Sequence, residues 1–152
     1  MKIEERIKAI GINLPENSKP GGMYVPVKHL GNALYVAGQV PFVDGKLKYT
    51  GKVGKERTLE EAQDAAKICI INLLAAVKDY IGDLDKIVNV IKLQAFVSSE
   101  VGFAEQHIVV NAASELLYEI FGELGRHART AVGTNKLPLD ATVEIEAILE
   151  YK

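Results

Sequence analysis

The stretch that decides the fold is residues 58–97, TLEEAQDAAKICIINLLAAVKDYIGDLDKIVNVIKLQAFV. Thr58 and Glu61 have the spacing of a capping box, in which each side chain accepts a hydrogen bond from the backbone amide of the other residue. An apolar-periodic run follows directly, so the sequence predicts a helix over Leu59–Ile81. Ile87–Val97 is rich in Val and Ile and has apolar residues at both odd and even positions, which predicts a central strand.

Downstream of this stretch, the apolar spacing predicts a second helix over Phe103–Leu124, ended by Gly125. Its apolar stripe consists of Val109, Ala113, Leu116, Ile120 and Leu124. Two strand-like runs follow, Arg129–Thr134 and Thr142–Leu149. In the second run Val143, Ile145, Ala147 and Leu149 are expected to face one way, and Glu144, Glu146, Ile148 and Glu150 the other.

Upstream, two further strands are expected at Tyr24–Val27 and Ala33–Ala37, on either side of the turn-forming pair Gly31-Asn32. Pro26 has no N–H to donate to a neighbouring strand, so the first of these strands should lie at a sheet edge. A third short piece is expected to turn at Asp44-Gly45.

The first 23 residues look like an N-terminal extension of a single domain that spans residues 1–152. Ile3–Ile10 predicts a short amphipathic helix ended by Gly11. Prolines and glycines crowd residues 15–22 and predict a loop there.

The predicted order of the main elements is β-β-α-β-α-β-β, which indicates an α+β fold with two helices on one face of a mixed sheet. The opposite face is expected to be too apolar to stand in water, since Val36, Ile91 and Leu93 cannot all point to the helices. A second subunit is the economical cover for such a face.

Composition narrows the function classes. Hydrophobic residues make up 48% of the 152-residue chain and charged residues 25%, which is typical of a globular protein. The net charge is −2 and no segment concentrates Lys and Arg, which argues against a nucleic-acid partner. No window approaches the roughly 20 apolar residues that cross a bilayer, and the charged first ten residues lack an export signal. We therefore expect a soluble, cytoplasmic protein.

General catalytic signatures do not point to a chemistry, because the chain has no phosphate loop, dinucleotide fingerprint, nucleophile elbow or zinc-binding helix motif. His29, His107 and His127 share no metal-ligand spacing, so no metal site is expected. Cys69 lies on the apolar stripe of the first long helix, which favours a packing role over a nucleophilic one. A single cysteine also fits a reducing compartment.

The C-terminal part of the chain is more specific. Gly125–Gly133 reads GRHARTAVG and is followed by Leu137-Pro138 and by VEIEA at Val143–Ala147. In these motifs the sequence resembles the Rid (YjgF-type) family, whose signature runs Ala-Arg-Ser or Thr, then Leu-Pro, then Val-Glu-Ile-Glu-Ala. A supporting block consists of Tyr24, Leu30-Gly31-Asn32 and Gly38-Gln39-Val40-Pro41. The resemblance covers about Tyr24–Tyr151, and the residues before it look like those of a longer branch of the family.

This resemblance implies a chorismate-mutase-like fold, assembled as a homotrimer with a cleft between neighbouring subunits. In the family the arginine matching Arg129 binds the carboxylate of a 2-imino or enamine acid, and the glutamate matching Glu144 helps to hold the attacking water. A 2-keto acid and ammonia leave. The substrate-binding positions that the family implies are Tyr24, Ala37, Gly38, Asn111 and Ala131. Neither a metal nor an organic cofactor is required, because a guanidinium can grip a carboxylate bidentately and a protonated imine is already electrophilic.

Three positions depart from the pattern of the active deaminases. Ala37 stands where they often have a serine, Ala131 where they commonly have a cysteine, and His127 where a proline is frequent. The pocket therefore keeps its carboxylate anchor and loses part of its polar wall. These changes indicate an altered substrate range or a loss of deaminase activity.

Other roles stay open at this point. One is a non-catalytic module that uses Arg129 to hold a carboxylate metabolite. The other is an endoribonuclease, an activity also attributed to the family; it is the weaker alternative, because the chain has neither a basic groove nor a pair of histidines for acid and base work. Arg129 would otherwise be a structural ion-pair residue at the start of a strand. Glu146, beside Glu144, is expected to be structural.

Overall fold

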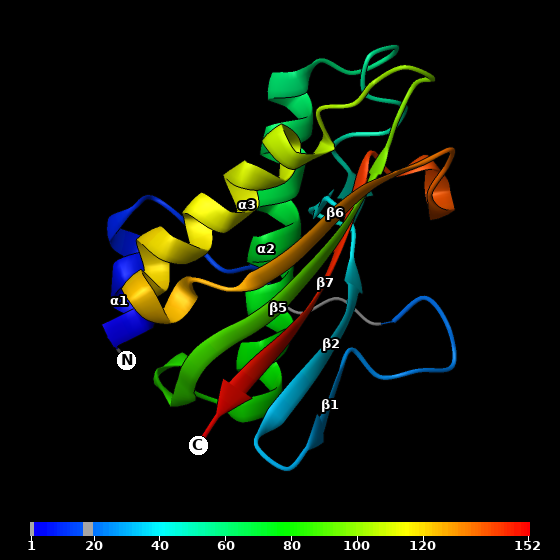
Figure 1. The fold of residues 1–152 in the computed structure, drawn as a ribbon. Helices are drawn as coiled ribbons and strands as arrows, with labels where there is room; N and C mark the ends of the chain where they lie inside the picture. Colours follow the sequence, from blue (N-terminus) through cyan, green and yellow to red (C-terminus); the bar gives the residue numbers. More distant parts are fainter. Residues whose placement is uncertain (1, 17–19) are drawn as a thin grey trace.

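The fold is built on a five-stranded mixed sheet in the order β1-β2-β7-β5-β6 (Figure 1). The computed structural model describes residues 2–16 and 20–152. The strands of the sheet are β1 (Val27–Leu30), β2 (Ala33–Gln39), β5 (Ile87–Ser98), β6 (Ala128–Thr134) and β7 (Val143–Tyr151). β5 and β6 are parallel, and the other neighbouring pairs are antiparallel. A small hairpin of β3 (Phe42–Val43) and β4 (Lys46–Leu47) turns at Asp44 and Gly45, as predicted.

The helices are α1 (Lys2–Ala9), α2 (Leu59–Ile81) and α3 (Gln106–Phe121). Short 3₁₀ turns precede β5, β6 and β7, at Leu84–Lys86, Gly122–Gly125 and Pro138–Asp140. α2 has the bounds that the sequence predicts. Both hydrogen bonds of the Thr58 and Glu61 capping box form, and Gly82 ends the helix with a φ of 83°. Within the described residues, no helix combines the length and the apolar character needed to span a membrane.

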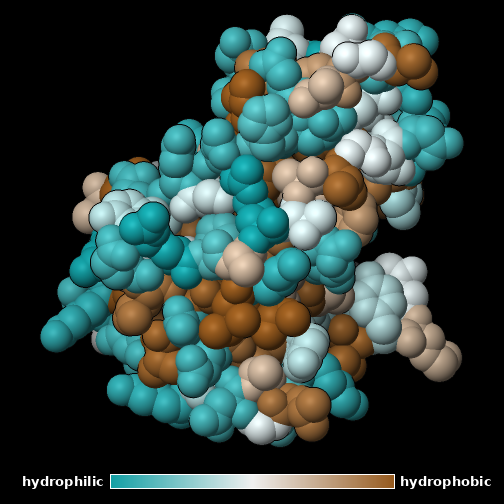
Figure 2. All heavy atoms as spheres, in the orientation of Figure 1, coloured by the Kyte–Doolittle hydropathy of each residue, from teal (hydrophilic) through white to brown (hydrophobic). Residues whose placement is uncertain are grey.

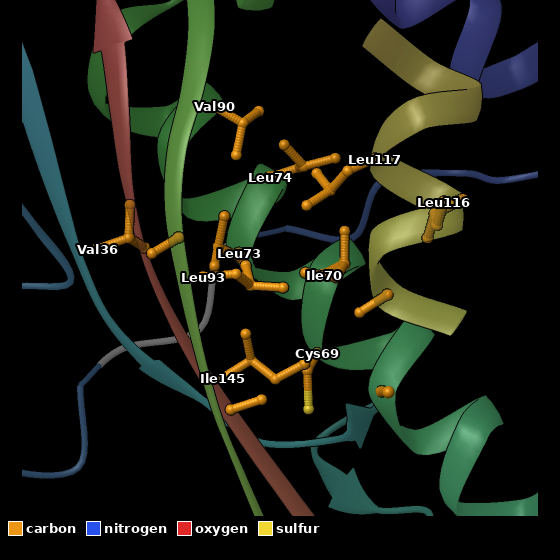
Figure 3. Packing of buried hydrophobic residues seen from close by; sticks show 14 of the residues in the cluster. Val36, Cys69, Ile70, Leu73, Leu74, Val90, Leu93, Leu116, Leu117 and Ile145 are labelled. Carbon is orange, nitrogen blue, oxygen red and sulfur yellow. The ribbon is translucent and has the colours of Figure 1, made fainter. Parts of the chain in front are cut away.

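The core lies between the sheet and the two long helices, which pack on the same face of the sheet. Figure 3 shows Leu93 of β5 and Ile145 of β7 pointing toward Ile70 and Leu73 of α2. Cys69 is fully buried in this layer, so the predicted packing role is confirmed. The α+β architecture with two helices on one face is likewise as predicted.

The opposite side of the sheet, called here the open face, is more mixed than the sequence suggests. Of the three residues that were not all expected to point to the helices, Val36 and Leu93 do so and are 3% and 0% exposed. Ile91 is 40% exposed, so the expectation holds for this residue alone. The register places Tyr35, Lys92, Gln94, Phe96, Val132, Glu144, Glu146 and Ile148 on the open face. Figure 2 shows hydrophobic side chains gathered where Figure 1 draws β5 and β7. The open face is thus apolar in patches, with charged side chains among them that include Glu144 and Glu146.

The first strand differs from its prediction. β1 spans Val27–Leu30 rather than Tyr24–Val27, because strand bounds depend on the pairing partner and β1 pairs with β2 across a tight turn at Gly31. Pro26 lies just outside β1 and still accepts a hydrogen bond from the Ala37 amide at 2.8 Å. β1 forms one edge of the sheet, as the proline indicates.

The second long helix is shorter than the apolar stripe suggests. α3 ends at Phe121, because Gly122 leaves helical geometry with a φ of 66°. A 3₁₀ turn follows, and Leu124 in that turn is 51% exposed rather than part of the stripe. The helix also begins at Gln106 instead of Phe103.

The N-terminal helix α1 is docked on the domain. The backbone amides of Lys2 and Ile3 donate to the Asp85 carboxylate, and Arg6 Nη1 donates to the Ile120 carbonyl at 2.8 Å. Of the loop predicted at 15–22, residues 17–19 lie outside the described part of the chain.

Replacing Leu93 with Ala is expected to lower the free energy of unfolding by about 2–5 kcal/mol, because the substitution leaves a cavity between the sheet and α2. Leu30→Ala serves as the control, since Leu30 is 73% exposed at the end of β1 and its loss should cost below about 1 kcal/mol. Guanidinium chloride titrations followed by circular dichroism compare the two variants. Equal losses would contradict the assignment of Leu93 to the core.

Candidate functional site

Arg129 is held against α3 by three hydrogen-bond acceptors. Its Nη1 donates to Asn111 Oδ1 at 3.0 Å and to Ser114 Oγ at 3.1 Å, and its Nη2 donates to the His107 carbonyl at 3.3 Å. All three acceptors lie on α3, whereas Arg129 lies on β6. The guanidinium therefore bridges the edge of the sheet to the helix above it.

This arrangement leaves part of the guanidinium unused. Of its five N–H donors, the three bonds to α3 occupy both on Nη1 and one on Nη2. The Nε–H and the second Nη2–H have no acceptor in the described part of the chain. Two donors on adjacent nitrogens are what a carboxylate needs for bidentate binding. Arg129 is thus fixed in place and still has two donors for a ligand.

Ser114 and His127 extend the hydrogen bonding behind Arg129. The Ser114 hydroxyl lies 2.9 Å from His127 Nε2, and His127 Nδ1 lies 2.7 Å from the Gly125 carbonyl oxygen. Burial lowers the pKa of His127; the bond to the Gly125 carbonyl opposes this change, and the nearby charge of Arg129 adds to it. The ring is therefore biased toward its neutral form.

A tight backbone approach brings these residues together. A Cβ atom on Gly125 would collide with the Leu117 carbonyl oxygen, so only glycine lets this turn pass so close to α3. Beside it is a pocket of about 480 Å³, lined by Ser114, Glu115, Tyr118, Gly125, Arg126, His127 and Arg129. Arg129 thus stands at the wall of an open pocket.

Glu144 lies on β7 and faces the open side of the sheet, opposite a bulge in the neighbouring strand β2. The regular pairing of β2 with β7 is interrupted between Val36 and Gln39, where Ala37 and Gly38 lie. A Cβ atom on Gly38 would come within 2.9 Å of the Glu144 carboxyl group, so glycine lets that carboxyl rest against the backbone. Burial raises the pKa of Glu144, and the charge of Glu146 raises it further.

A second pocket of about 370 Å³ opens on this face, between β2, β5 and β7. Its lining includes Ala37, Glu146 and Lys92. Tyr24 does not line it, although its neighbour Val25 does. The Tyr24 side chain is 54% exposed in the loop before β1.

The two halves of the predicted site lie on opposite faces of the sheet. Arg129 is paired with Leu93, whose side chain points to the helices, whereas Glu144 is paired with Phe96 on the open face. Because side chains alternate along a strand, the register fixes this separation. Asn111 and Ala131 accompany Arg129 on the helix side.

The sequence prediction did not single out Ser114 as a site residue and treated His127 only as a departure from the family pattern. A signal was available, since His107, Asn111, Ser114 and Tyr118 recur at helical spacing and form a polar stripe along a mostly apolar helix. The spacing of residues along the helix does not predict that this polar stripe faces Arg129.

Metal ligation and thiol chemistry find little support in the residues that can be described. Within 2–16 and 20–152, no group of three or more His, Cys, Asp or Glu side chains is arranged to hold a metal ion. Burial raises the pKa of the Cys69 thiol well above its ordinary value, so the thiolate is disfavoured.

The sheet order and the two helices on one face define a chorismate-mutase-like α+β fold. Residues 4–150 match the family model described as "YjgF/chorismate_mutase-like, putative endoribonuclease". The chain therefore belongs to the YjgF/chorismate mutase-like family, as its motifs suggested.

Relatives of similar length are known. Protein TCP17 from Trypanosoma cruzi is 39% identical over 150 residues, which are 98% of this chain and 94% of that protein. The crystal structure of Atu1372, a protein of unknown function from Agrobacterium tumefaciens, is 49% identical with a TM-score of 0.94 and covers 99% of this chain and 93% of its own. The YjgF gene product from E. coli is 25% identical with a TM-score of 0.64, over 90% and 94% of the two chains. The chain thus resembles Atu1372 more closely than the E. coli protein.

Glu144→Gln is expected to raise the melting temperature at pH 7 and to have no effect near pH 4. The folded-state pKa of Glu144 lies above the unfolded value, so its contribution to stability is full below the unfolded pKa and is lost as the pH rises through the folded pKa. Gln has nearly the same shape as the Glu144 side chain but carries no charge at any of these pH values. Because the group is half-exposed, the gain should be no more than a few degrees.

Calorimetry between pH 4 and pH 8 measures this effect, with Glu150→Gln on the same face of β7 as the control. A melting temperature that falls at pH 7 would mean that the Glu144 charge stabilises the fold, contrary to its raised pKa.

Proposed function

We propose that this protein hydrolyses reactive 2-imino or enamine acids to 2-keto acids and ammonia in the cytoplasm, at sites shared between the subunits of a homotrimer. The observation that carries this proposal is the state of Arg129, which α3 holds in place while two of its donors stay available. A pre-positioned guanidinium orients a small carboxylate without a further ordering cost at the moment of binding.

The chemistry needs a base near the imine carbon, and Glu144 suits that role. A carboxylate with a raised pKa is a stronger base than an ordinary carboxylate. In the proposed reaction Glu144 takes a proton from water, and the oxygen attacks the carbon of the protonated C=N bond. The resulting carbinolamine receives that proton on nitrogen. Its C–N bond then breaks, ammonia leaves, and loss of the hydroxyl proton gives the 2-keto acid.

Two features of the chain support an assembly of several subunits, as the proposed trimer requires. Arg129 and Glu144 lie on opposite faces of one sheet, so a site that uses both draws on two chains. In addition, β6 forms a sheet edge seven residues long, and Arg129 is its one charged residue. Exposed edges of this kind usually carry charges or are covered. A neighbouring subunit laid along β6 would cover the edge and bring its own Glu144 toward Arg129.

The matched family description also names endoribonuclease activity, which makes RNA cleavage a second candidate. The pocket beside Arg129 has Arg126 and His127 on its wall, but also Glu115. Incubation with a single-stranded RNA tests this candidate directly. A non-catalytic carboxylate binder is the remaining alternative, and it would bind a 2-keto acid without releasing one from an imine.

Arg129→Lys is expected to lower kcat/KM for imine hydrolysis about ten- to hundredfold, because Lys keeps the charge and loses the two-pronged donor pair. Freshly generated 2-aminoacrylate is the substrate, and release of the keto acid is followed. The control is Arg6→Lys, since Arg6 also donates to a carbonyl of α3 but lies on α1.

Light scattering on the same preparations should give a mass near three times the 16.6 kDa of one chain. If Arg129→Lys leaves catalysis unchanged while its melting temperature or trimer content falls, Arg129 is a structural residue. Absence of hydrolysis in the wild type together with tight keto-acid binding would establish the binder instead.

A further inference from the structure

His127 takes no part in the proposed chemistry, yet it belongs to a continuous chain of hydrogen bonds that ends at the guanidinium. Arg129 Nη1 lies 3.1 Å from Ser114 Oγ, Ser114 Oγ lies 2.9 Å from His127 Nε2, and His127 Nδ1 lies 2.7 Å from the Gly125 oxygen. The three side chains come from β6, α3 and the turn between them.

The donors and acceptors fix the direction of this chain. A carbonyl oxygen only accepts, so His127 Nδ1 must carry a hydrogen. In the neutral ring Nε2 then has a lone pair, and the Ser114 hydroxyl donates to it. With its hydrogen committed to His127, the Ser114 oxygen turns a lone pair to Arg129, which only donates. Every hydrogen bond of the chain therefore has one possible donor and one possible acceptor: Arg129 donates to Ser114, Ser114 donates to His127, and His127 donates to the Gly125 carbonyl.

Burial and the charge of Arg129 favour the neutral ring that this hydrogen-bond direction requires. Arg129 and Arg126 line the same pocket, as do Glu115 and Tyr118 of α3. Burial lowers the pKa of His127, and the charge of Arg129 lowers it further. A protonated ring would present an N–H to Ser114 and place a second cation close to the guanidinium.

We propose that Ser114 and His127 are positioning residues for Arg129, and that they hold its guanidinium so that the Nε and second Nη2 donors face a bound carboxylate. This inference rests on the role of Arg129 as the carboxylate anchor in the proposed function. His127 acts through Ser114 and touches no substrate. The histidine thus supplies an orienting acceptor from the turn that Gly125 allows to approach α3.

A positioning role predicts a particular kinetic pattern. Arg129 would hold the carboxylate equally in the ground state and in the transition state, so loosening it weakens binding without changing the chemical step. Ser114→Ala and His127→Leu should therefore raise KM, and the Kd of pyruvate as a keto-acid probe, about two- to tenfold. kcat should stay within about twofold of the wild type.

The decisive variant is His127→Gln, whose side-chain oxygen can accept from Ser114 in place of Nε2 and cannot titrate. It should restore KM and the pyruvate Kd close to wild-type values. Ser99→Ala and His29→Leu serve as matched controls, because both residues make hydrogen bonds away from Arg129. Nitrogen NMR of the wild-type histidine rings at pH 7 should find His127 neutral, with its hydrogen on Nδ1.

Pyruvate binding and imine hydrolysis by these variants distinguish the positioning role of Ser114 and His127 from the proposed deaminase function. If Arg129→Lys abolishes pyruvate binding while Ser114→Ala and His127→Leu leave it unchanged, Arg129 is the anchor and the positioning role is wrong. An imidazolium, or a neutral ring with hydrogen on Nε2, would also overturn it. If the variants shift the pyruvate Kd as expected but no imine is hydrolysed, the positioning role stands and the deaminase proposal fails.

Discussion

The candidate site depends on one interaction, the attachment of the Arg129 guanidinium to α3. β6 is an edge strand, where a long side chain would ordinarily sample many rotamers in water. Three acceptors on the helix remove that freedom and leave two donors available. The fold supplies these acceptors because α3 packs on the sheet through its apolar stripe, and the polar stripe of the same helix then faces the edge strand. The packing that forms the core therefore also places Arg129 against its acceptors on α3.

The alternation of side chains along the strands imposes the second constraint. Arg129 faces the helix side and Glu144 the open face, so the two side chains do not converge on one ligand within the subunit described. A function that needs both residues must be a property of an assembly. In the proposed assembly, a neighbouring chain would account for three features together: the exposed edge of β6, the apolar patches of the open face and the separation of Arg129 from Glu144.

Local signals in the sequence predicted the elements whose bounds are set locally. The capping box and Gly82 gave α2 its bounds, because both act on neighbouring backbone groups. β1 was misplaced, since hydrogen bonding to β2 decides where that strand begins. Motif resemblance identified Arg129, Glu144 and Asn111 as site candidates, but the face on which each lies follows from the sheet register, which spacing along the chain does not contain. The pairing of Ser114 with His127 likewise requires α3 to be placed against the turn at Gly125.

The shared site is tested most directly by mixing two impaired variants, Arg129→Lys and Glu144→Gln, each purified separately and then unfolded and refolded together in equal amounts, and by assaying them at a substrate concentration well below the KM of the wild type. If every site takes Arg129 from one chain and Glu144 from its neighbour, random assembly restores an intact pair at about one quarter of the interfaces, so about a quarter of the wild-type imine hydrolysis should return. Activity no greater than the sum of the two parent variants, in mixed trimers confirmed by mass, would contradict a site built from two subunits.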